Sequence, residues 1–280
     1  MKEFKGRVAV ITGGGSGIGL GMARAFAQRG MKLVLADLDQ KALDTAVEEF
    51  SASGVEVIGK HCDVSKLEEI QALADSAMDT FGAVHVLCNN AGIGIPTSSM
   101  KMKLQDWKWI IDVDLWGPIY GVQVFMPLIE AQGEGHINST SSMAGLMAGR
   151  TMGAYNVAKH GVVALMASLE RELRSRKSPI TASVLCPGPI NTNISRHSVE
   201  FRPPLEQVAT NSDLAKPKSG SKGDKIQAIL EQGMDPDEVG TLVADAIEHD
   251  KFWILTHPWW TKGIQKELDA MREDQSLTRG

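Results

Sequence analysis

Short apolar runs alternate along most of the chain with longer stretches in which apolar residues recur at helical spacing. The short runs are rich in Val, Ile and Leu, which is typical of strands that are covered on both faces. Strands that alternate with helices indicate a parallel sheet with helices on both sides. The predicted strands are residues 7–11, 32–36, 55–60, 84–88, 135–139, 180–186 and 252–255. The pattern therefore predicts an α/β fold with a doubly wound, Rossmann-like parallel sheet of seven strands.

Two short motifs mark helix starts between these strands. Residues 65–68 (Ser-Lys-Leu-Glu) have the pattern of a capping box, which predicts a helix beginning just after the third strand. Residues 235–236 (Asp-Pro) combine an N-cap with a proline at the first helical position, which predicts a helix to about His249. No repeat or linker divides the chain, so we predict a single domain over residues 1–280.

Three segments depart from the regular alternation. Residues 191–234 contain prolines and glycines that interrupt a weak helical pattern, and an irregular tract of this length is typical of a functional lid. Residues 109–131 predict a helix that is apolar nearly all round, which favours burial at a subunit interface. Residues 252–280 form a tail whose large aromatic side chains could close over a substrate or pack on a neighbouring subunit. Those side chains are Phe252, Trp253, Trp259 and Trp260.

Charge and composition exclude several classes of function. The formal net charge of -5 gives no electrostatic support for nucleic-acid binding. No stretch approaches the roughly 18 unbroken apolar residues that a membrane span needs. The three cysteines lie far apart in apolar surroundings, and no His or Cys pair has zinc-ligand spacing. We therefore expect a cytoplasmic protein with no metal site, no nucleic-acid partner and no membrane segment.

A glycine-rich stretch over residues 12–19 lies between the first predicted strand and an apolar helix. Glycines there let the backbone approach a phosphate, and the helix N-terminus supplies free N–H groups. The spacing differs from the common G-x-G-x-x-G motif, so the place between strand and helix is what favours a dinucleotide site. A tight turn that binds nothing is the alternative.

Asp37 ends the second predicted strand, 18 positions after Gly19. An acid about 20 residues after such a loop binds the ribose hydroxyls of the adenosine half of NAD. A carboxylate there would repel a 2′-phosphate, and no Lys or Arg adjoins it, so the sequence favours NAD over NADP. A simple turn residue is the alternative.

Tyr155 and Lys159 are four positions apart and would share one face of a helix. A nearby ammonium lowers the pKa of a phenol, which is otherwise a poor base at neutral pH. The pair follows residues 138–142, a Ser-rich strand end whose side chains we expect in a ligand crevice. Because this spacing is common, a surface pair without a catalytic role is the alternative.

Taken in order along the chain, these motifs resemble the short-chain dehydrogenase/reductase family in its compact single-domain form. The motifs that carry the resemblance are residues 12–19, 63–64, 89–92 (Asn-Asn-Ala-Gly), 142, 155, 159 and 187–192 (Pro-Gly-Pro-Ile-Asn-Thr). The match covers roughly residues 5–195, and residues 235–256 more loosely. The domain over residues 1–280 is then a dinucleotide-binding and catalytic unit.

The resemblance implies roles for individual residues. Those implied to contact the cofactor are Gly13, Ser16, Ile18 and Gly19 at the pyrophosphate, Asp37 at the adenosine ribose, Asp63 and Val64 at the adenine, Asn90, Tyr155 and Lys159 in the ribose region, and Ile190 and Thr192 at the nicotinamide. Tyr155 would be the general acid/base, and Lys159 would lower its pKa. Ser142, 13 positions before Tyr155, would bind the substrate oxygen in preference to Ser141.

Asp114 departs from the family pattern, which usually has an Asn that anchors a water beside the lysine. An ionised carboxylate accepts hydrogen bonds but donates none. Near Lys159 it would stabilise the ammonium and partly offset the effect of that charge on the Tyr155 pKa. We hypothesise that the proton relay survives with a shifted pH profile, and Asp114 therefore joins Ser142, Tyr155 and Lys159 as a predicted catalytic residue.

The sequence predicts an NAD-dependent oxidoreductase that interconverts a secondary alcohol and a ketone, as a homodimer or homotetramer. Met143, Met147 and Met152, together with the aromatic tail, favour an apolar or cyclic substrate. A non-catalytic NAD-binding sensor or scaffold on the same fold is the main alternative, and the intact Ser-Tyr-Lys set speaks against it. An epimerase or dehydratase is disfavoured by chain length, and NADPH-dependent reduction by Asp37.

Overall fold

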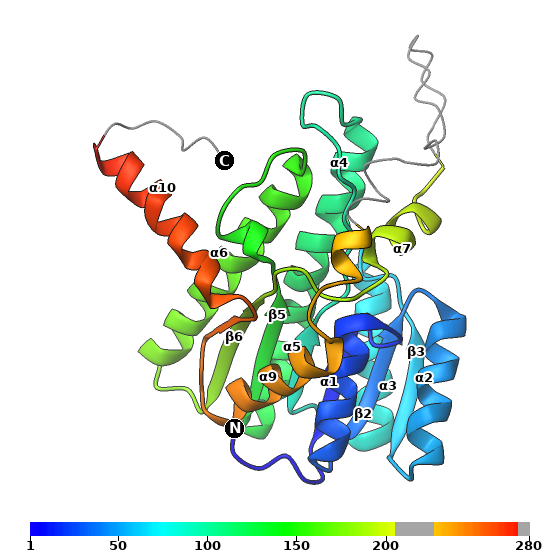
Figure 1. The fold of residues 1–280 in the computed structure, drawn as a ribbon. Coiled ribbons are helices and arrows are strands. Elements are labelled where there is room, and N and C mark those ends of the chain that lie inside the picture. Colours follow the sequence, from blue (N-terminus) through cyan, green and yellow to red (C-terminus); the bar gives the residue numbers. More distant parts are fainter. Residues whose placement is uncertain (205–226, 274–280) are drawn as a thin grey trace.

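Seven parallel strands form one sheet in the order β3-β2-β1-β4-β5-β6-β7 in the computed structural model, which describes residues 1–204 and 227–273 (Figure 1). The strands are β1 Val8–Thr12, β2 Lys32–Asp37, β3 Val57–His61, β4 Val86–Asn89, β5 Gly135–Thr140, β6 Ile180–Cys186 and β7 Trp253–Leu255. Every strand begins and ends within two residues of its predicted bounds, because each is a short apolar run between polar segments. The predicted single-domain α/β fold is confirmed.

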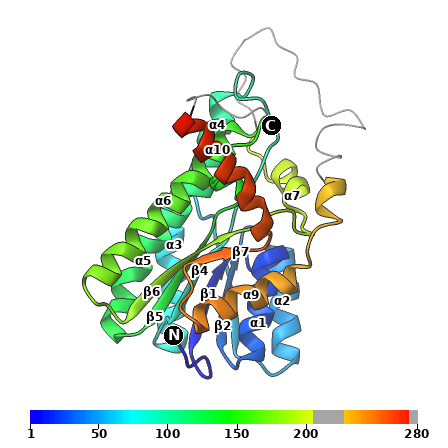
Figure 2. The same ribbon diagram turned by 60° about the vertical axis from the view of Figure 1, so that its left-hand side comes forward.

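Helices cover both faces of the sheet (Figures 1 and 2). They are α1 Gly17–Gln28, α2 Gln40–Ala52, α3 Leu67–Phe81, α4 Leu104–Ile111, α5 Gly117–Gln132, α6 Gly153–Ser175, α7 Ile194–Glu200, α9 Pro236–Glu248 and α10 Thr261–Glu273. Successive residues of β1 enter opposite cores: Val8 and Val10 pack with α3, α5 and α6, whereas Ala9 and Ile11 pack with α1, α2 and α9. Burial on both faces explains why the strands have apolar runs without polar alternation.

Two glycines allow α1 and α9 to pack closely against each other. A Cβ added at Gly21 would overlap the carbonyl of Pro236, and one added at Gly240 would overlap the carbonyl of Gly21. The start of α9 is capped as predicted, because the Asp235 side chain accepts the Asp237 N–H at 2.8 Å. The close packing of α9 on α1 holds the chain after residue 226 against the first helix of the fold.

Two local predictions are wrong. The helix after β3 forms, but its N-cap is Lys66 and no side chain caps it, because the Ser65 hydroxyl instead donates to Asp63 at 2.6 Å. The predicted helix over 109–131 is not one regular α-helix: α4 passes through a π-helical turn, Asp112–Trp116, before α5 begins.

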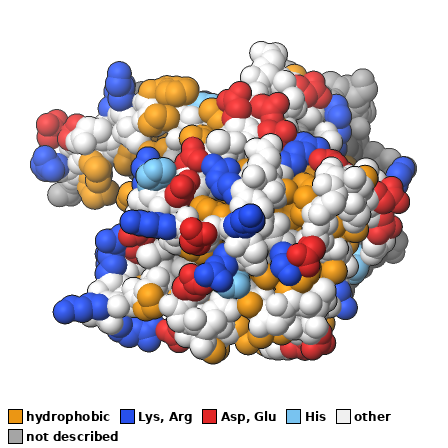
Figure 3. All heavy atoms as spheres, turned by 90° about the horizontal axis from the view of Figure 1, so that it is seen from below, with side chains coloured by type: hydrophobic (Ala, Val, Ile, Leu, Met, Phe, Trp, Pro, Cys, Tyr) orange, Lys and Arg blue, Asp and Glu red, His pale blue; other side chains and the backbone are white. Residues whose placement is uncertain are grey.

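The C-terminal helix α10 extends away from the sheet (Figures 1 and 2). Its apolar side chains are visible on this arm in Figure 3, in which Lys and Arg are interspersed with acids over the rest of the face. Trp259 and Trp260 are 59% and 39% exposed and lie beside His257. Within the two described ranges, no helix is long and apolar enough to cross a bilayer.

Candidate active site and cofactor cleft

A cavity of about 480 Å³ opens at the carboxyl edge of the sheet, where the strand order reverses between β1 and β4. Such switch points are where parallel sheets bind ligands. The predicted site residues that line it are Gly13, Ser16, Ile18, Asp37, Asp63, Val64, Asn90, Tyr155, Lys159 and Thr192. Motifs spread over most of the chain therefore converge on one cleft.

The glycine-rich turn between β1 and α1 has the geometry of an anion cradle. Gly13 and Gly17 have φ values of 63° and 51°, in the left-handed region that glycine tolerates. A Cβ at Gly19 would overlap the carbonyl of Gly13, so Gly19 keeps the turn tight although it does not line the cavity. The Ser16 side chain does not cap α1, whose first turn has no acidic residue. The N-terminus of α1 thus remains suited to a pyrophosphate.

Asp37 lines the same cavity as Tyr155 and contacts the glycine-rich turn. Its Oδ2 accepts the Gly15 N–H at 2.9 Å, and its Oδ1 accepts the Asp39 N–H at 3.0 Å. Burial raises the pKa of this carboxyl, partly offset by those backbone donors. The carboxylate is therefore fixed in orientation beside the turn, as an acid that binds two neighbouring hydroxyls must be.

Asn90 holds the ends of three strands together. Its Nδ2 donates to the Thr12 carbonyl at 3.1 Å, and its Oδ1 accepts from the Thr140 hydroxyl at 3.1 Å. The Thr12 hydroxyl accepts the backbone N–H groups of Asn90 and Ala91. Thr12 and Thr140 were not predicted as site residues. Their place at strand ends is a signal, but only the strand order shows that these ends adjoin.

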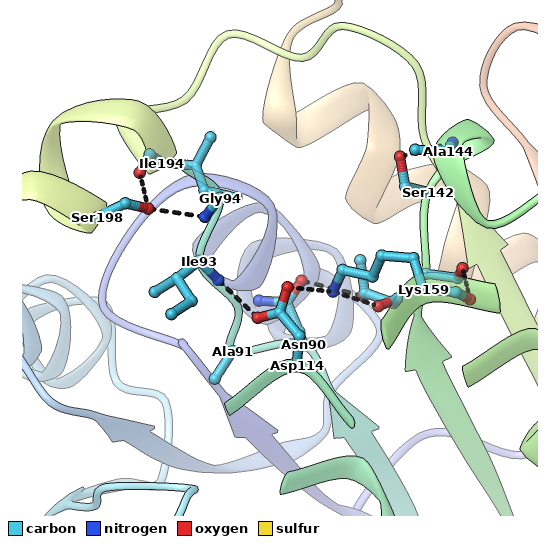
Figure 4. Close-up of polar contacts among 12 residues, drawn as sticks. Asn90, Ala91, Ile93, Gly94, Asp114, Ser142, Ala144, Lys159, Ile194 and Ser198 are labelled. Atoms are coloured by element: carbon cyan, nitrogen blue, oxygen red, sulfur yellow. Dashed lines mark hydrogen bonds and ion pairs between the residues drawn. The ribbon is translucent and has the colours of Figure 1, made fainter. Parts of the chain in front are cut away.

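Lys159 is buried between α6 and the strand ends and has two polar neighbours (Figure 4). Its Nζ donates to the Thr140 carbonyl at 3.2 Å and lies 3.6 Å from Asp114 Oδ2. The same Nζ is 5.5 Å from the centre of the Tyr155 ring. The structure thus brings together Tyr155, Lys159 and Asp114, as the spacing and the resemblance predicted.

The pKa of Tyr155 is raised, opposite to the direction expected from Lys159 alone. Burial is the largest cause, and the Asp114 charge adds to it. Lys159 lowers the pKa as predicted, and the Ser142 hydroxyl acts in the same direction, but the two do not outweigh burial. Burial therefore favours the neutral phenol form of Tyr155.

Asp114 is fully buried in the π-helical turn between α4 and α5. Its Oδ1 accepts the Ile93 N–H at 2.8 Å, whereas Oδ2 has no partner within hydrogen-bond distance among the described residues. Burial raises its pKa to about 6, although Lys159 and the Ile93 N–H both oppose the shift. A carboxyl group that titrates near neutral pH thus adjoins the predicted catalytic lysine.

Ser142 and Ser141 differ clearly in their surroundings. Ser141 is 1% exposed, and its hydroxyl donates to the Lys159 carbonyl at 2.8 Å. Ser142 is half-buried, its Oγ accepts the Ala144 N–H at 3.0 Å (Figure 4), and its hydroxyl interacts with the Tyr155 phenol. This geometry favours Ser142 for binding a substrate oxygen, although Ser141 rather than Ser142 is among the cavity-lining residues.

Helix α7 and the segment after it cover the cleft. Thr192 contacts the glycine-rich turn, since a Cβ at Gly17 would lie 3.0 Å from its Cγ2. The Ile190 side chain is 3% exposed and packs in the core, so any cofactor contact from it must come through its backbone. The lining residues that the sequence did not single out include Ile93, Trp109, Ile194, His197 and Phe201. The predicted lid extends over 191–234, of which 205–226 lie outside the described residues.

The proposed apolar lining from the tail does not reach the cleft. None of Phe252, Trp253, Trp259 and Trp260 is among the residues that line the cavity in the described part of the chain. Met143 is 3% exposed in the core, and Met147 lies beside Gly263 of α10. The apolar wall comes instead from the segment after β4, from α4 and from α7.

Known proteins share this arrangement. The family model described as short chain dehydrogenase matches residues 7–203. The crystal structure of a short chain dehydrogenase/reductase from Burkholderia phymatum in complex with NAD has a TM-score of 0.92 and 38% sequence identity, and covers 100% of this chain and 99% of that chain. The putative oxidoreductase SadH of Mycobacterium tuberculosis is 38% identical over 198 residues, 71% of this chain and 72% of its own. The CLA biosynthesis dehydrogenase/reductase of Lactiplantibacillus plantarum is 30% identical over 280 residues, 98% of this chain and 96% of its own.

Proposed function

This chain belongs to the short-chain dehydrogenase family of oxidoreductases, and we propose that it uses NAD to interconvert a secondary alcohol and a ketone. The observation that carries the proposal is that one cavity is lined both by the glycine-rich turn and Asp37 and by the Tyr155–Lys159 pair. A proton-transferring group and a dinucleotide cradle in one cavity are what such a reaction requires.

The residues of the cleft fit NAD in their chemistry. The N-terminus of α1 and the turn around Gly13 favour the negative pyrophosphate. Each carboxylate oxygen of Asp37 accepts one backbone N–H and can accept a further hydrogen bond, which suits a ribose diol. The negative charge of the carboxylate opposes a 2′-phosphate. Val64 is 7% exposed and offers an apolar surface for a flat base. NAD supplies the hydride acceptor or donor when it is bound.

The protein's own residues then handle the proton and the substrate oxygen. In the oxidative direction Tyr155 acts as the phenolate and takes the hydroxyl proton of the alcohol, which leaves the phenol, and in the reductive direction the phenol gives its proton to the ketone oxygen. The Ser142 hydroxyl donates a hydrogen bond to the same oxygen as its negative charge develops. The Lys159 ammonium stabilises the phenolate form of Tyr155, against the burial that favours the phenol.

The substrate is an apolar alcohol or ketone in this proposal. Ile93, Trp109, Ile194 and Phe201 give the cleft an apolar wall, which stabilises a hydrophobic substrate by excluding water from both surfaces. Residues 192–203 form the part of the predicted lid that lines the cavity, and residues 205–226 of that lid lie outside the described residues.

The chain's own composition offers a matched test, because it contains only two tyrosines. Tyr155→Phe removes the hydroxyl that carries the proton, whereas Tyr120→Phe changes a tyrosine that stacks on Trp116 at 5.5 Å. With NAD+ and a panel of secondary alcohols, we expect NADH formation to fall at least about a hundredfold in Tyr155→Phe and to stay near wild type in Tyr120→Phe. Binding of NAD+ without turnover of any alcohol or ketone would instead support the non-catalytic sensor.

A further inference from the structure

The lid helix α7 is attached to the segment after β4 by a buried hydroxyl (Figure 4). Ser198 is 0% exposed, and its Oγ accepts the Gly94 N–H at 2.8 Å while donating to the Ile194 carbonyl at 2.6 Å. Ile194 and His197 of the same helix line the cavity. The position of α7 over the cleft is therefore linked directly to Gly94.

The backbone amide of Ile93, just before Gly94, joins the same segment to Asp114. The Ile93 N–H donates to Asp114 Oδ1 at 2.8 Å, and Asp114 Oδ2 lies 3.6 Å from Lys159 Nζ. Consecutive amides thus bind the lid helix and the acid beside the catalytic lysine. Because peptide units are rigid and only two soft torsions separate these amides, a shift at Gly94 reorients Ile93 unless those torsions absorb it.

The surroundings leave this segment little room to move independently. A Cβ at Gly92 would lie 3.2 Å from Lys159 Nζ and 3.3 Å from Asp114 Oδ1, and one at Gly94 would lie 3.6 Å from the Tyr155 ring. Residues 92–94 therefore pack directly on the predicted catalytic groups. Any displacement of the segment changes the distances among those groups.

A second contact fixes the far end of α7. Arg202 makes two hydrogen bonds to Asp106 of α4, at 2.9 and 2.6 Å, and Asp106 is only 5% exposed. A bidentate pair of this kind holds a defined orientation. Arg196 of α7 also pairs with Glu231, but Ser198 is the residue of the helix that bonds to the segment after β4, so movement of α7 reaches that segment through Ser198.

We propose that Ser198 is a positioning residue that couples the seating of α7 over the cleft to the geometry of the Asp114–Lys159 pair. Occupation of the cleft beneath Ile194 and His197 then adjusts the proton-handling groups through two backbone amides. The proposal rests on the proposed function for its catalytic consequence. The coupling itself is a property of the ligand-free protein.

The first test measures the coupling without turnover. Amide hydrogen exchange at residue resolution is compared among the wild type, Ser198→Ala and the control Ser195→Ala, which alters another buried serine of α7. The Ser195 side chain makes no hydrogen bond within the described ranges. We expect exchange at both Gly94 and Ile93 to accelerate at least about tenfold in Ser198→Ala only. Acceleration confined to Gly94, or equal in both variants, would overturn the coupling.

The second test measures its effect on catalysis. The charged and titratable groups facing Asp114 are Lys159 and Tyr155 of α6, so their mutual distances set the pH dependence of kcat. We expect Ser198→Ala to shift the pH–kcat curve, Ser195→Ala to leave it in place, and Ser198→Ala to add no shift in an Asp114→Asn background. An equal shift in that background would refute the assignment. A wild type without turnover would refute the proposed function, and the exchange data would still decide the coupling.

Discussion

Replacing Asp114 by Asn removes a titrating carboxyl group from a fully buried position while keeping the shape of the side chain. The carboxyl has its pKa raised from 3.8 to about 6 by burial. The folded protein therefore retains a proton that the unfolded chain releases between these two pH values. The free energy of unfolding falls as pH rises across that window, and the loss is complete above about pH 6.

The magnitude follows from the size of the shift. Each pKa unit corresponds to about 1.4 kcal/mol, so the full shift corresponds to about 3 kcal/mol, of which about 2.4 kcal/mol develops between pH 4 and 7 because the unfolded carboxyl is already partly ionised at pH 4. Asn has no such dependence. The difference in unfolding free energy between wild type and Asp114→Asn should therefore change by about 2.4 kcal/mol between pH 4 and 7, whatever constant offset arises from leaving Lys159 without its partner.

His136 provides a second test, because its contribution to the free energy of unfolding changes with pH in the opposite direction to that of Asp114. Its ring is 0% exposed, lies 2.7 Å from both Thr181 Oγ1 and Ser183 Oγ, and has its pKa lowered by burial to about 3. The unfolded chain binds this proton below pH 6.5, so His136 destabilises the fold as pH falls. The two contributions oppose each other between about pH 4 and 6. Asp114→Asn should therefore expose a loss of about 1.4 kcal/mol per pH unit on acidification.

Urea unfolding at one fixed protein concentration, repeated from pH 4 to 7, measures both quantities. Adding His136→Gln to Asp114→Asn should remove the acid-side slope that the single variant exposes. A wild-type-minus-variant difference that stays constant within about 1 kcal/mol across the range would refute the reasoning. It would mean that Asp114 does not hold a raised pKa in the folded protein.

Two further substitutions test the cleft and the packing beneath it. Asp37→Ser should raise the kcat/KM ratio for NADP+ over NAD+ at least about tenfold, because the charge that repels a 2′-phosphate is gone; steady-state rates with both cofactors measure it, and an unchanged ratio would contradict the role of Asp37. Gly240→Ala should destabilise the fold by about 1–3 kcal/mol, because its methyl group would overlap the Gly21 carbonyl where α9 meets α1; thermal unfolding measures it, and a neutral substitution would show that the two helices separate freely.

The sheet was predictable because its physical signal is local. Each strand is a short apolar run, and burial on both faces requires such a run whatever its neighbours. The capping prediction at Ser65 was wrong because its outcome depends on more than the local pattern. Whether Ser65 caps its helix depends on a competing acceptor, Asp63, whose orientation the motif does not encode. A local pattern predicts structure only where no nearby polar group offers an equal hydrogen bond.

The sequence motifs predicted which residues at strand ends and helix starts meet in the cleft, but not which side chains of α7 line it. Tyr155, Lys159, Asp37 and the glycine-rich turn lie at strand ends and helix starts, so their convergence follows from the parallel topology. The side chains of α7 that face the cavity have no such signal. Which face of a short helix turns inward depends on Ser198 reaching Gly94, a contact across 104 positions of sequence.

Asp114 is unusual both in the sequence and in the structure. It departs from the family pattern, and it lies in the π-helical turn that interrupts the helical path from α4 to α5. Inserting a π turn rotates the residues that follow it, and such turns are frequent at functional sites. In this protein the turn leaves the buried Asp114 Oδ2 without a hydrogen bond among the described residues, which lowers the stability of the fold. A sequence that keeps an irregular turn and a raised carboxyl pKa beside its lysine sacrifices stability at that point. Local rules are broken at functional sites, which is why a buried acid in an irregular turn beside Lys159 is the position where we expect substitution to change the proton chemistry of this protein.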